Sequence, residues 1–321
     1  MHVIPPRAVP LPTPLPAGSA VDALEDLVSR GYTTLDFADH YGDAELFYGD
    51  LTRRLGPKGL EAQGFTKWVP SPGEMSRAVV ERAVRRSMTR MGVDRLDLMQ
   101  FHWWDYSDGR YLDAMRVLSQ LRDEGLIREI GLTNFDTKRT RELLDAGVPV
   151  ASSQSQFSVI DTRPLDGGMA ALCEERGVRI LAYGVLAGGM LSDAWLGRDE
   201  PKYKSDVPYT SHRKYLSGTV LPWGSWALFQ EMLRTLKGVG ERHGGASVSV
   251  VSIAWVLRQP GVGGVIVGLR AGLSEHADDN ARAVALADSL TKRDLDEIRA
   301  VQAKGKPLIG TVGDCGDEYR R

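Results

Sequence analysis

The sequence predicts a single-domain α/β fold, a (β/α)8 TIM barrel with parallel strands. Short apolar runs alternate with amphipathic runs along most of the chain, the pattern that strands and helices of a parallel sheet produce. The strand-like runs are apolar nearly throughout, as a sheet covered by helices requires. A doubly wound sheet shows the same alternation, but seven or eight strand–helix units in one chain of 321 residues favour the barrel.

Seven strands can be counted in order from residue 33 to residue 270. The expected strands are 33–39, 63–68, 95–103, 127–135, 149–158, 179–186 and 263–270. The expected helices are 21–31, 44–56, 74–92, 111–125, 137–147, 168–177, 226–244, 247–261 and 274–290. Several of these helices end in glycine, the residue favoured just past a helix C-terminus.

Three segments depart from the alternation. Residues 1–18 are an irregular start with six prolines, and an eighth strand, which would come first in the barrel, must lie there. Residues 192–224 are expected to form a long irregular loop over the active face, since a connection of this length is usually functional. Residues 303–321 form a C-terminal tail.

Composition excludes several classes of protein. The net charge is −2 with acids and bases interleaved, so neither nucleic acid nor an anionic membrane is expected as a partner. Cys173 and Cys315 lie far apart without a CxxC motif, which fits a reducing compartment and argues against a disulfide framework or a zinc site. The histidines show no metal-binding spacing, so no metal is expected. The start lacks the features of a signal peptide, and we expect a cytoplasmic protein.

Four polar residues follow or end the first three expected strands. They are Asp36, Tyr41, Lys67 and His102. The C-terminal ends of parallel barrel strands share one face, so these side chains are expected to converge there. An ammonium beside a phenol lowers the pKa of the phenol, a carboxylate holds the ammonium in place, and an imidazole orients a substrate oxygen. Such a set suits proton delivery to a carbonyl oxygen while a cofactor supplies hydride.

Each of these residues also has a structural interpretation. Asp36 and Lys67 suit an ion pair at a barrel rim without any catalytic role, and His102 alone suits a semi-buried histidine. Trp68 and Trp103 follow Lys67 and His102, and their rings either line an apolar substrate pocket or pack in the core beneath it. We favour the pocket for both.

The same residues lie in segments that resemble the aldo-keto reductase family, in family order, over nearly all of 22–280. The segments are GYTTLDFADHYGDAE, FTK, QFHW, GLTNF, SQSQFS, LAYGVLAGGML and VGLRAGLSEHADDN. The resemblance implies Asp36, Tyr41, Lys67 and His102 as the catalytic tetrad, with Tyr41 as the general acid. It implies the following residues as cofactor-binding: Thr133, Asn134, Gln154, Tyr183, Gly268, Arg270, His276, Asp279 and Asn280.

The resemblance also implies a function and a cofactor. No G-x-G-x-x-G follows a strand, so the dinucleotide would bind without a Rossmann fold. Arg270 suits a 2′-phosphate, which favours NADP(H) over NAD(H). The leading hypothesis is an NADP(H)-dependent enzyme that reduces a small aldehyde or ketone to an alcohol, or runs in reverse. The alternatives are a catalytically weak cofactor-sensing regulatory subunit of the same fold, and a lyase or isomerase that uses Lys67 as a Schiff base.

Overall fold

The centre of the molecule is a seven-stranded parallel sheet. The computed structural model describes residues 17–71, 73–202, 206–207, 209–268 and 276–320. The strands pair in chain order, each with the next. They are β1 (Thr34–Asp36), β2 (Gln63–Trp68), β3 (Leu96–His102), β4 (Ile127–Thr133), β5 (Val150–Gln156), β6 (Arg179–Tyr183) and β7 (Val262–Val265). Each of these strands lies within an expected strand, apart from one residue of β7. The predicted α/β barrel class is confirmed.

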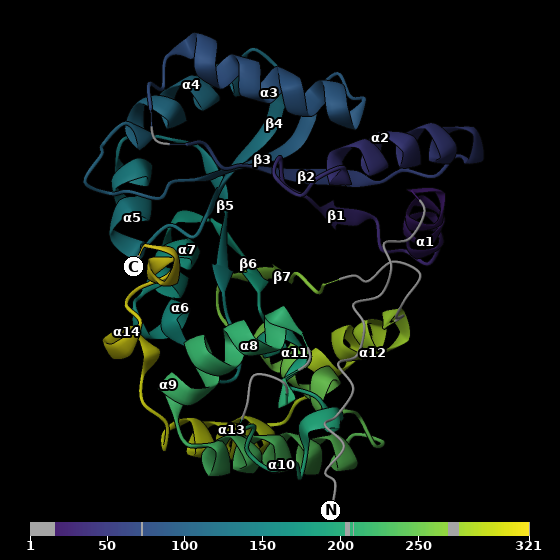
Figure 1. The fold of residues 1–321 in the computed structure, drawn as a ribbon, viewed down its shortest axis with the longest axis vertical. Coiled ribbons are helices and arrows are strands. Elements are labelled where there is room, and N and C mark those ends of the chain that lie inside the picture. The colour runs from purple at the N-terminus through teal and green to yellow at the C-terminus, as the bar shows by residue number, and fades with distance from the viewer. Residues whose placement is uncertain (1–16, 72, 203–205, 208, 269–275, 321) are drawn as a thin grey trace, which may run out of the picture.

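Helices cover the outside of the curled sheet, as Figure 1 shows. The longer ones are α1 (Ala17–Ser29), α2 (Ala44–Leu55), α3 (Arg77–Met91), α4 (Tyr111–Asp123), α5 (Thr137–Asp145), α7 (Met169–Arg176), α10 (Trp226–Arg242), α11 (Val248–Leu257), α12 (Ala277–Ala287) and α13 (Lys292–Gln302). Side-chain hydrogen bonds cap the N-termini of several helices. Asp136 caps α5, because its carboxylate accepts the Arg139 backbone N–H at 2.6 Å. Among the described helices, none has the length and apolarity needed to cross a membrane.

The two outer strands of the sheet do not pair with each other within the described residues. β1 pairs only with β2, and β7 only with β6. Near this gap α1 and α12 approach, with an ion pair of 2.7 Å between Arg30 and Asp278. The Tyr32 hydroxyl also donates to the backbone oxygen of Ala277. The eighth strand expected within 1–18 falls on residues outside the described part, except that residues 17 and 18 begin α1.

The segment 192–224, expected to be irregular, is largely helical in its described second half. It contains η3 (Asp193–Trp195), α8 (Thr210–Tyr215), the π-helical turn η5 (Leu216–Val220) and α9 (Leu221–Trp223). The expectation of an irregular loop was therefore wrong for this half. Burial explains the difference, because Tyr215, Val220 and Trp223 are all core residues, and a buried backbone must satisfy its own hydrogen bonds.

The tail that begins at residue 303 is also ordered. It contains α14 (Leu308–Thr311) and the short η6 (Asp317–Tyr319). It runs past α9 and ends beside α5 and α7, in yellow in Figure 1. The Asp314 carboxylate accepts the backbone N–H of Thr137 at 2.8 Å, which ties the tail to the start of α5.

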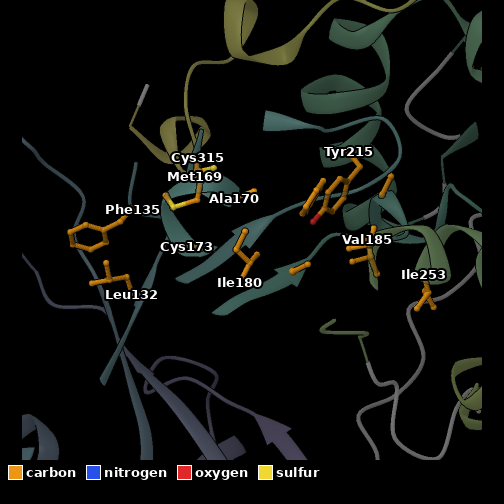
Figure 2. Close-up of a cluster of buried hydrophobic side chains, with 14 of the residues drawn as sticks. Leu132, Phe135, Met169, Ala170, Cys173, Ile180, Val185, Tyr215, Ile253 and Cys315 are labelled. Atoms are coloured by element: carbon orange, nitrogen blue, oxygen red, sulfur yellow. The ribbon is translucent and has the colours of Figure 1, made fainter. Parts of the chain in front are cut away.

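The hydrophobic core fills the space between the sheet and its helices. Figure 2 shows part of it, with Ile180 from β6, Met169 and Cys173 from α7, and Cys315 from the tail. Both cysteines are reduced and fully buried. Burial raises the pKa of the Cys173 thiol to about 12, so it packs as a small apolar group. The tail is therefore part of the barrel core.

Two glycines on α10 test how tightly the helices pack. A methyl group at Gly240 would overlap the backbone oxygen of Ala246, whereas one at Gly238 would meet open space. We expect Gly240→Ala to lower the free energy of unfolding by about 1–3 kcal/mol through overpacking. Gly238→Ala should raise it by about 0.5–1 kcal/mol through helix propensity. Urea unfolding of both variants checks this, and equal effects would contradict the close packing.

Candidate active site

A cavity of about 1690 Å³ lies inside the curled sheet. Its walls include side chains from every strand from β1 to β7, and the predicted Asp36, Tyr41, Lys67 and His102 all line it. It is larger than a usual small-molecule pocket of roughly 300–1,000 Å³. The parallel register explains the convergence, because Lys67 lies opposite Gln100 and His102 opposite Thr133 on adjacent strands. The structure thus brings the four predicted catalytic residues to one cavity.

Asp36 and Lys67 form an ion pair inside the barrel. The Lys67 Nζ donates to Asp36 Oδ2, and the lysine side chain is only 3% exposed. The other carboxylate oxygen, Oδ1, accepts from the amides of Gln100 at 2.8 Å and Gln154 at 3.0 Å. Burial lowers the pKa of the Lys67 ammonium, and the charge of Asp36 opposes that shift. The pair is therefore a fixed, hydrogen-bonded unit.

Tyr41 lies in the turn after β1, with its backbone N–H bonded to the Ala38 oxygen. Its ring is 5.2 Å from the Lys67 Nζ, measured to the ring centroid, and its side chain is 51% exposed at the mouth of the cavity. Desolvation, with the charges of Asp36 and Tyr319 adding to it, raises the pKa of Tyr41 to about 12. The net shift is upward, opposite to the lowering expected beside an ammonium, because desolvation is its largest cause and the charge of Asp36 adds to it.

His102 ends β3 and faces the cavity as a neutral imidazole. Burial, with the positive charge of Arg320 adding to it, lowers the pKa of His102 to about 4. Its ring stacks on Trp104 at 4.2 Å between centroids. Within the described part of the chain, its Nε2 is buried without a hydrogen-bond partner. A buried polar atom of this kind is costly unless something binds it, so Nε2 suits a substrate oxygen.

The predicted cofactor residues on or directly after β4, β5 and β6 line the same cavity. They are Thr133, Asn134, Gln154 and Tyr183. Gln154 does more than the resemblance implied, because its amide holds Asp36 and Gln100. Asn134 has a positive φ of 56°, and its Oδ1 accepts from the Tyr183 hydroxyl at 2.8 Å. The buried Oγ1 of Thr133 lacks a partner among the described atoms.

Some of the residues predicted to bind the cofactor phosphates line the cavity. Gly268, His276 and Asn280 line the cavity, after β7 and at the start of α12. Asp279 is exposed on α12 and is not among the described lining residues. Arg270 lies outside the described residues, so its predicted role stays a prediction.

Trp68 and Trp103 do not reach the cavity, contrary to the interpretation that we favoured. Both are buried and pack on Phe101, at 5.4 and 5.9 Å between ring centroids. The Trp103 indole N–H donates to the backbone oxygens of Asp105 and Asp108, which turns it toward the β3–α4 connection. The structural alternative, core packing beneath the pocket, describes them better. Trp104 and Tyr319 line the cavity in their place.

Two parts of the site were missed by sequence reasoning. Gln100 lies two residues before His102 on β3 and so points to the same interior face. A polar residue inside an apolar strand was the available signal. Tyr319 reaches the cavity from the tail and meets His102 edge-on at 5.9 Å. No local pattern marks it, because the contact spans most of the chain.

The residues present fit a bound dinucleotide and carbonyl substrate. Unpartnered buried atoms, His102 Nε2 and Thr133 Oγ1, border the cavity among the described residues. A phenol with a high pKa stands at its mouth. The fold and the site together define the class: an α/β barrel with acid–base groups at the C-terminal ends of its strands.

The family follows from comparison with known proteins. Residues 10–303 match the model of the Aldo/keto reductase family, and the chain belongs to this family. It is 27% identical over 278 residues to pyridoxal reductase, chloroplastic, of Arabidopsis thaliana, with 82% of this chain and 71% of that protein covered. It is 28% identical to the uncharacterized oxidoreductase YqkF of Bacillus subtilis, with 90% and 89% covered. The family resemblance predicted from the sequence is confirmed.

Solved structures share the fold. A glycerol dehydrogenase from Gluconobacter oxydans superposes with a TM-score of 0.71 at 22% identity, over 92% of this chain and 88% of that one. An aldo-keto reductase from Klebsiella pneumoniae, solved in complex with NADPH, gives a TM-score of 0.64 at 22% identity, over 89% and 85%.

The neutral state of His102 predicts a pH dependence of stability. Its pKa is about 4 in the folded chain and about 6.5 when unfolded. Between these values the unfolded chain binds more protons, so folding weakens as the pH falls. From pH 7.5 to 5.0 the wild-type protein should lose about 2 kcal/mol more stability than His102→Gln. Urea unfolding at both pH values checks this, and equal losses would show that His102 is not held neutral.

Proposed function

We propose that this protein is an NADP(H)-dependent oxidoreductase that reduces an aldehyde or ketone to an alcohol, or catalyses the reverse reaction. The observation that carries the proposal is the convergence of Tyr41, His102 and the Asp36–Lys67 pair on one cavity. Membership of the aldo/keto reductase family supports the oxidoreductase class. The cavity volume of about 1690 Å³ leaves room for a dinucleotide and a small carbonyl compound.

Each site residue has a role that its environment supports. The nicotinamide cofactor, when bound, supplies or accepts the hydride. The neutral imidazole of His102 hydrogen-bonds the carbonyl oxygen through Nε2 and aims it. Tyr41 gives its phenolic proton to that oxygen as negative charge develops there. The buried Lys67 ammonium, held by Asp36, stabilises the phenolate that remains.

The cofactor site is proposed to lie between β4 and the end of β7. Thr133, Asn134 and Tyr183 would hold the nicotinamide end. Gly268, His276 and Asn280, at the start of α12, would hold the adenosine phosphate end, where a helix N-terminus favours anions. The Klebsiella pneumoniae structure with NADPH supports NADP(H). A relative in Escherichia coli is an NADH-specific methylglyoxal reductase, so the preference needs a direct comparison of both cofactors.

Removing the Tyr41 hydroxyl should abolish most of the activity. We expect Tyr41→Phe to lower kcat for aldehyde reduction by about 10²–10⁴-fold, because a general acid contributes that much. NADPH oxidation with a panel of aromatic and aliphatic aldehydes is the assay. The control is Tyr111→Phe, whose hydroxyl bonds Glu142 at 2.5 Å in a groove away from the cavity.

Other outcomes of the same assay separate the alternatives. Unchanged turnover in Tyr41→Phe would remove Tyr41 from the mechanism. Tight NADPH binding by the wild-type protein without turnover would favour the regulatory subunit. Borohydride trapping of a substrate on Lys67, without nicotinamide binding, would favour a Schiff-base lyase or isomerase.

The pKa of Tyr41 sets the pH profile of reduction. A pKa of about 12 keeps the phenol protonated through the neutral range. The kcat/KM for the carbonyl, at saturating NADPH, should therefore not fall between about pH 7 and 9. A falling limb with a midpoint in that interval, lost in Tyr41→Phe, would show that the bound cofactor lowers the pKa of Tyr41.

A further inference from the structure

The turn between β1 and α2 places Tyr41 at the mouth of the cavity. The backbone of this turn is tied to β2, because the Asp39 N–H donates to the Lys67 oxygen at 2.9 Å. Gly42, the residue after Tyr41, has a φ of +58°, which residues other than glycine rarely adopt. Half of the Tyr41 side chain is exposed, so the surrounding packing holds its ring only in part. The direction of the phenol therefore depends on the path of this turn.

A cation on the neighbouring helix α3 holds the carbonyl group of that glycine. Arg90 lies near the end of α3 and donates through Nη2 to the backbone oxygen of Gly42. Its Nε donates to Glu45 Oε2 at 2.9 Å. The guanidinium group is planar and rigid, so two donors on it fix their two acceptors relative to each other. Arg90 therefore ties the turn that carries Tyr41 to the first turn of α2.

Glu45 anchors the Arg90 guanidinium against the sheet. The Glu45 side chain is fully buried, whereas that of Arg90 is 20% exposed. The other carboxylate oxygen, Oε1, accepts the Thr66 hydroxyl at 2.7 Å. Thr66 precedes Lys67 on β2, and successive residues of a strand point to opposite faces, so Thr66 faces the helices while Lys67 faces the cavity. One carboxylate therefore links the strand that carries Lys67 to the turn that carries Tyr41.

We propose that Arg90 is a positioning residue for proton transfer, which holds the Tyr41 phenol in place through the backbone of Gly42. The inference rests on the proposed function, because it takes Tyr41 as the proton donor. Proton transfer needs the donor within hydrogen-bond reach of the acceptor, and a displacement of about 1 Å can cost roughly 10²-fold in rate. Neither Arg90 nor Glu45 is among the described residues that line the cavity, so both act without touching a ligand.

Two variants weaken the contact to Gly42 in different ways. Arg90→Lys keeps a positive charge beside Glu45 but replaces two fixed donor nitrogens by one ammonium. Arg90→Met combined with Glu45→Gln removes the contact without leaving a buried charge unpaired. The enzyme–NADPH complex is mixed rapidly with an aldehyde, and the single-turnover rate separates the chemical step from product release. In both variants we expect this rate to fall about tenfold or more, while the Kd for NADPH changes less than about twofold.

Combination with Tyr41→Phe separates positioning from general damage. Because Arg90 acts through the phenol, Arg90→Lys should lower the rate of the wild-type protein but leave the residual rate of Tyr41→Phe unchanged. A merely structural role would lower both rates by the same factor. Arg85→Lys is the matched control, since Arg85 lies on the same helix and its Nε bonds Glu81 at 2.8 Å on the surface. Its rate should equal that of the wild-type protein.

Thermal unfolding of each variant accompanies the rates and shows that the protein is folded at the assay temperature. Equal losses in the wild-type and Tyr41→Phe backgrounds would overturn the proposal. Unchanged rates in both Arg90 variants, or a rise in the Kd for NADPH that matches the loss of rate, would overturn it as well. The proposed function survives these results as long as Tyr41→Phe itself is impaired. If Tyr41→Phe keeps the wild-type rate, or the wild-type protein reduces no aldehyde, the proposed function and this inference fail together.

Discussion

The Asp36–Lys67 ion pair is the constraint on which the site depends. Breaking a buried pair leaves an uncompensated charge, at a cost of about 3–5 kcal/mol, so both groups must meet in a defined geometry. Four strands meet that demand: β1 supplies the carboxylate, β2 the ammonium, and β3 and β5 the amides of Gln100 and Gln154. These side chains point inward because alternate residues of a strand share one face. The curled parallel sheet therefore has to form before the pair can exist.

The same pairing changes how Lys67 acts on its neighbours. An ammonium lowers the pKa of Tyr41, but the paired carboxylate of Asp36 acts in the opposite direction, and desolvation is the largest cause of the net rise. The phenol is then a group that holds its proton through the neutral range. In the proposed mechanism the Lys67 ammonium still limits this rise, because it favours the phenolate that forms when the proton leaves. Preorganised charge of this kind acts on the transition state without rearranging first.

Local sequence patterns predicted most of the fold and part of the site. Strand ends could be read from apolar runs, and residues at those ends were correctly expected to converge, because parallel strands share one C-terminal edge. The features that the sequence did not predict depend on contacts between residues far apart in the chain. The helices after residue 209 form because Tyr215 and Trp223 are buried. Tyr319 meets His102 only once the tail has crossed the barrel. Helix α13 had a readable signal, the capping box of Thr291 and Asp294, which the expected elements omitted.

Two acidic side chains, one lining the cavity and one in contact with the lining residue Tyr183, have comparable settings. Asp36 and Glu318 each give one oxygen to a buried cation and the other to neutral polar groups. A carboxylate whose first oxygen is fixed by a cation becomes a directional acceptor at the second, since it can no longer rotate freely. Asp36 in this way orients the amides of Gln100 and Gln154 beside the proton-transfer groups. Glu318 orients Tyr183 on the side proposed for the nicotinamide. Two buried cations, Lys67 and Arg163, thus order the neutral polar side chains around them through these carboxylates. That arrangement lets the site hold its geometry before any ligand enters.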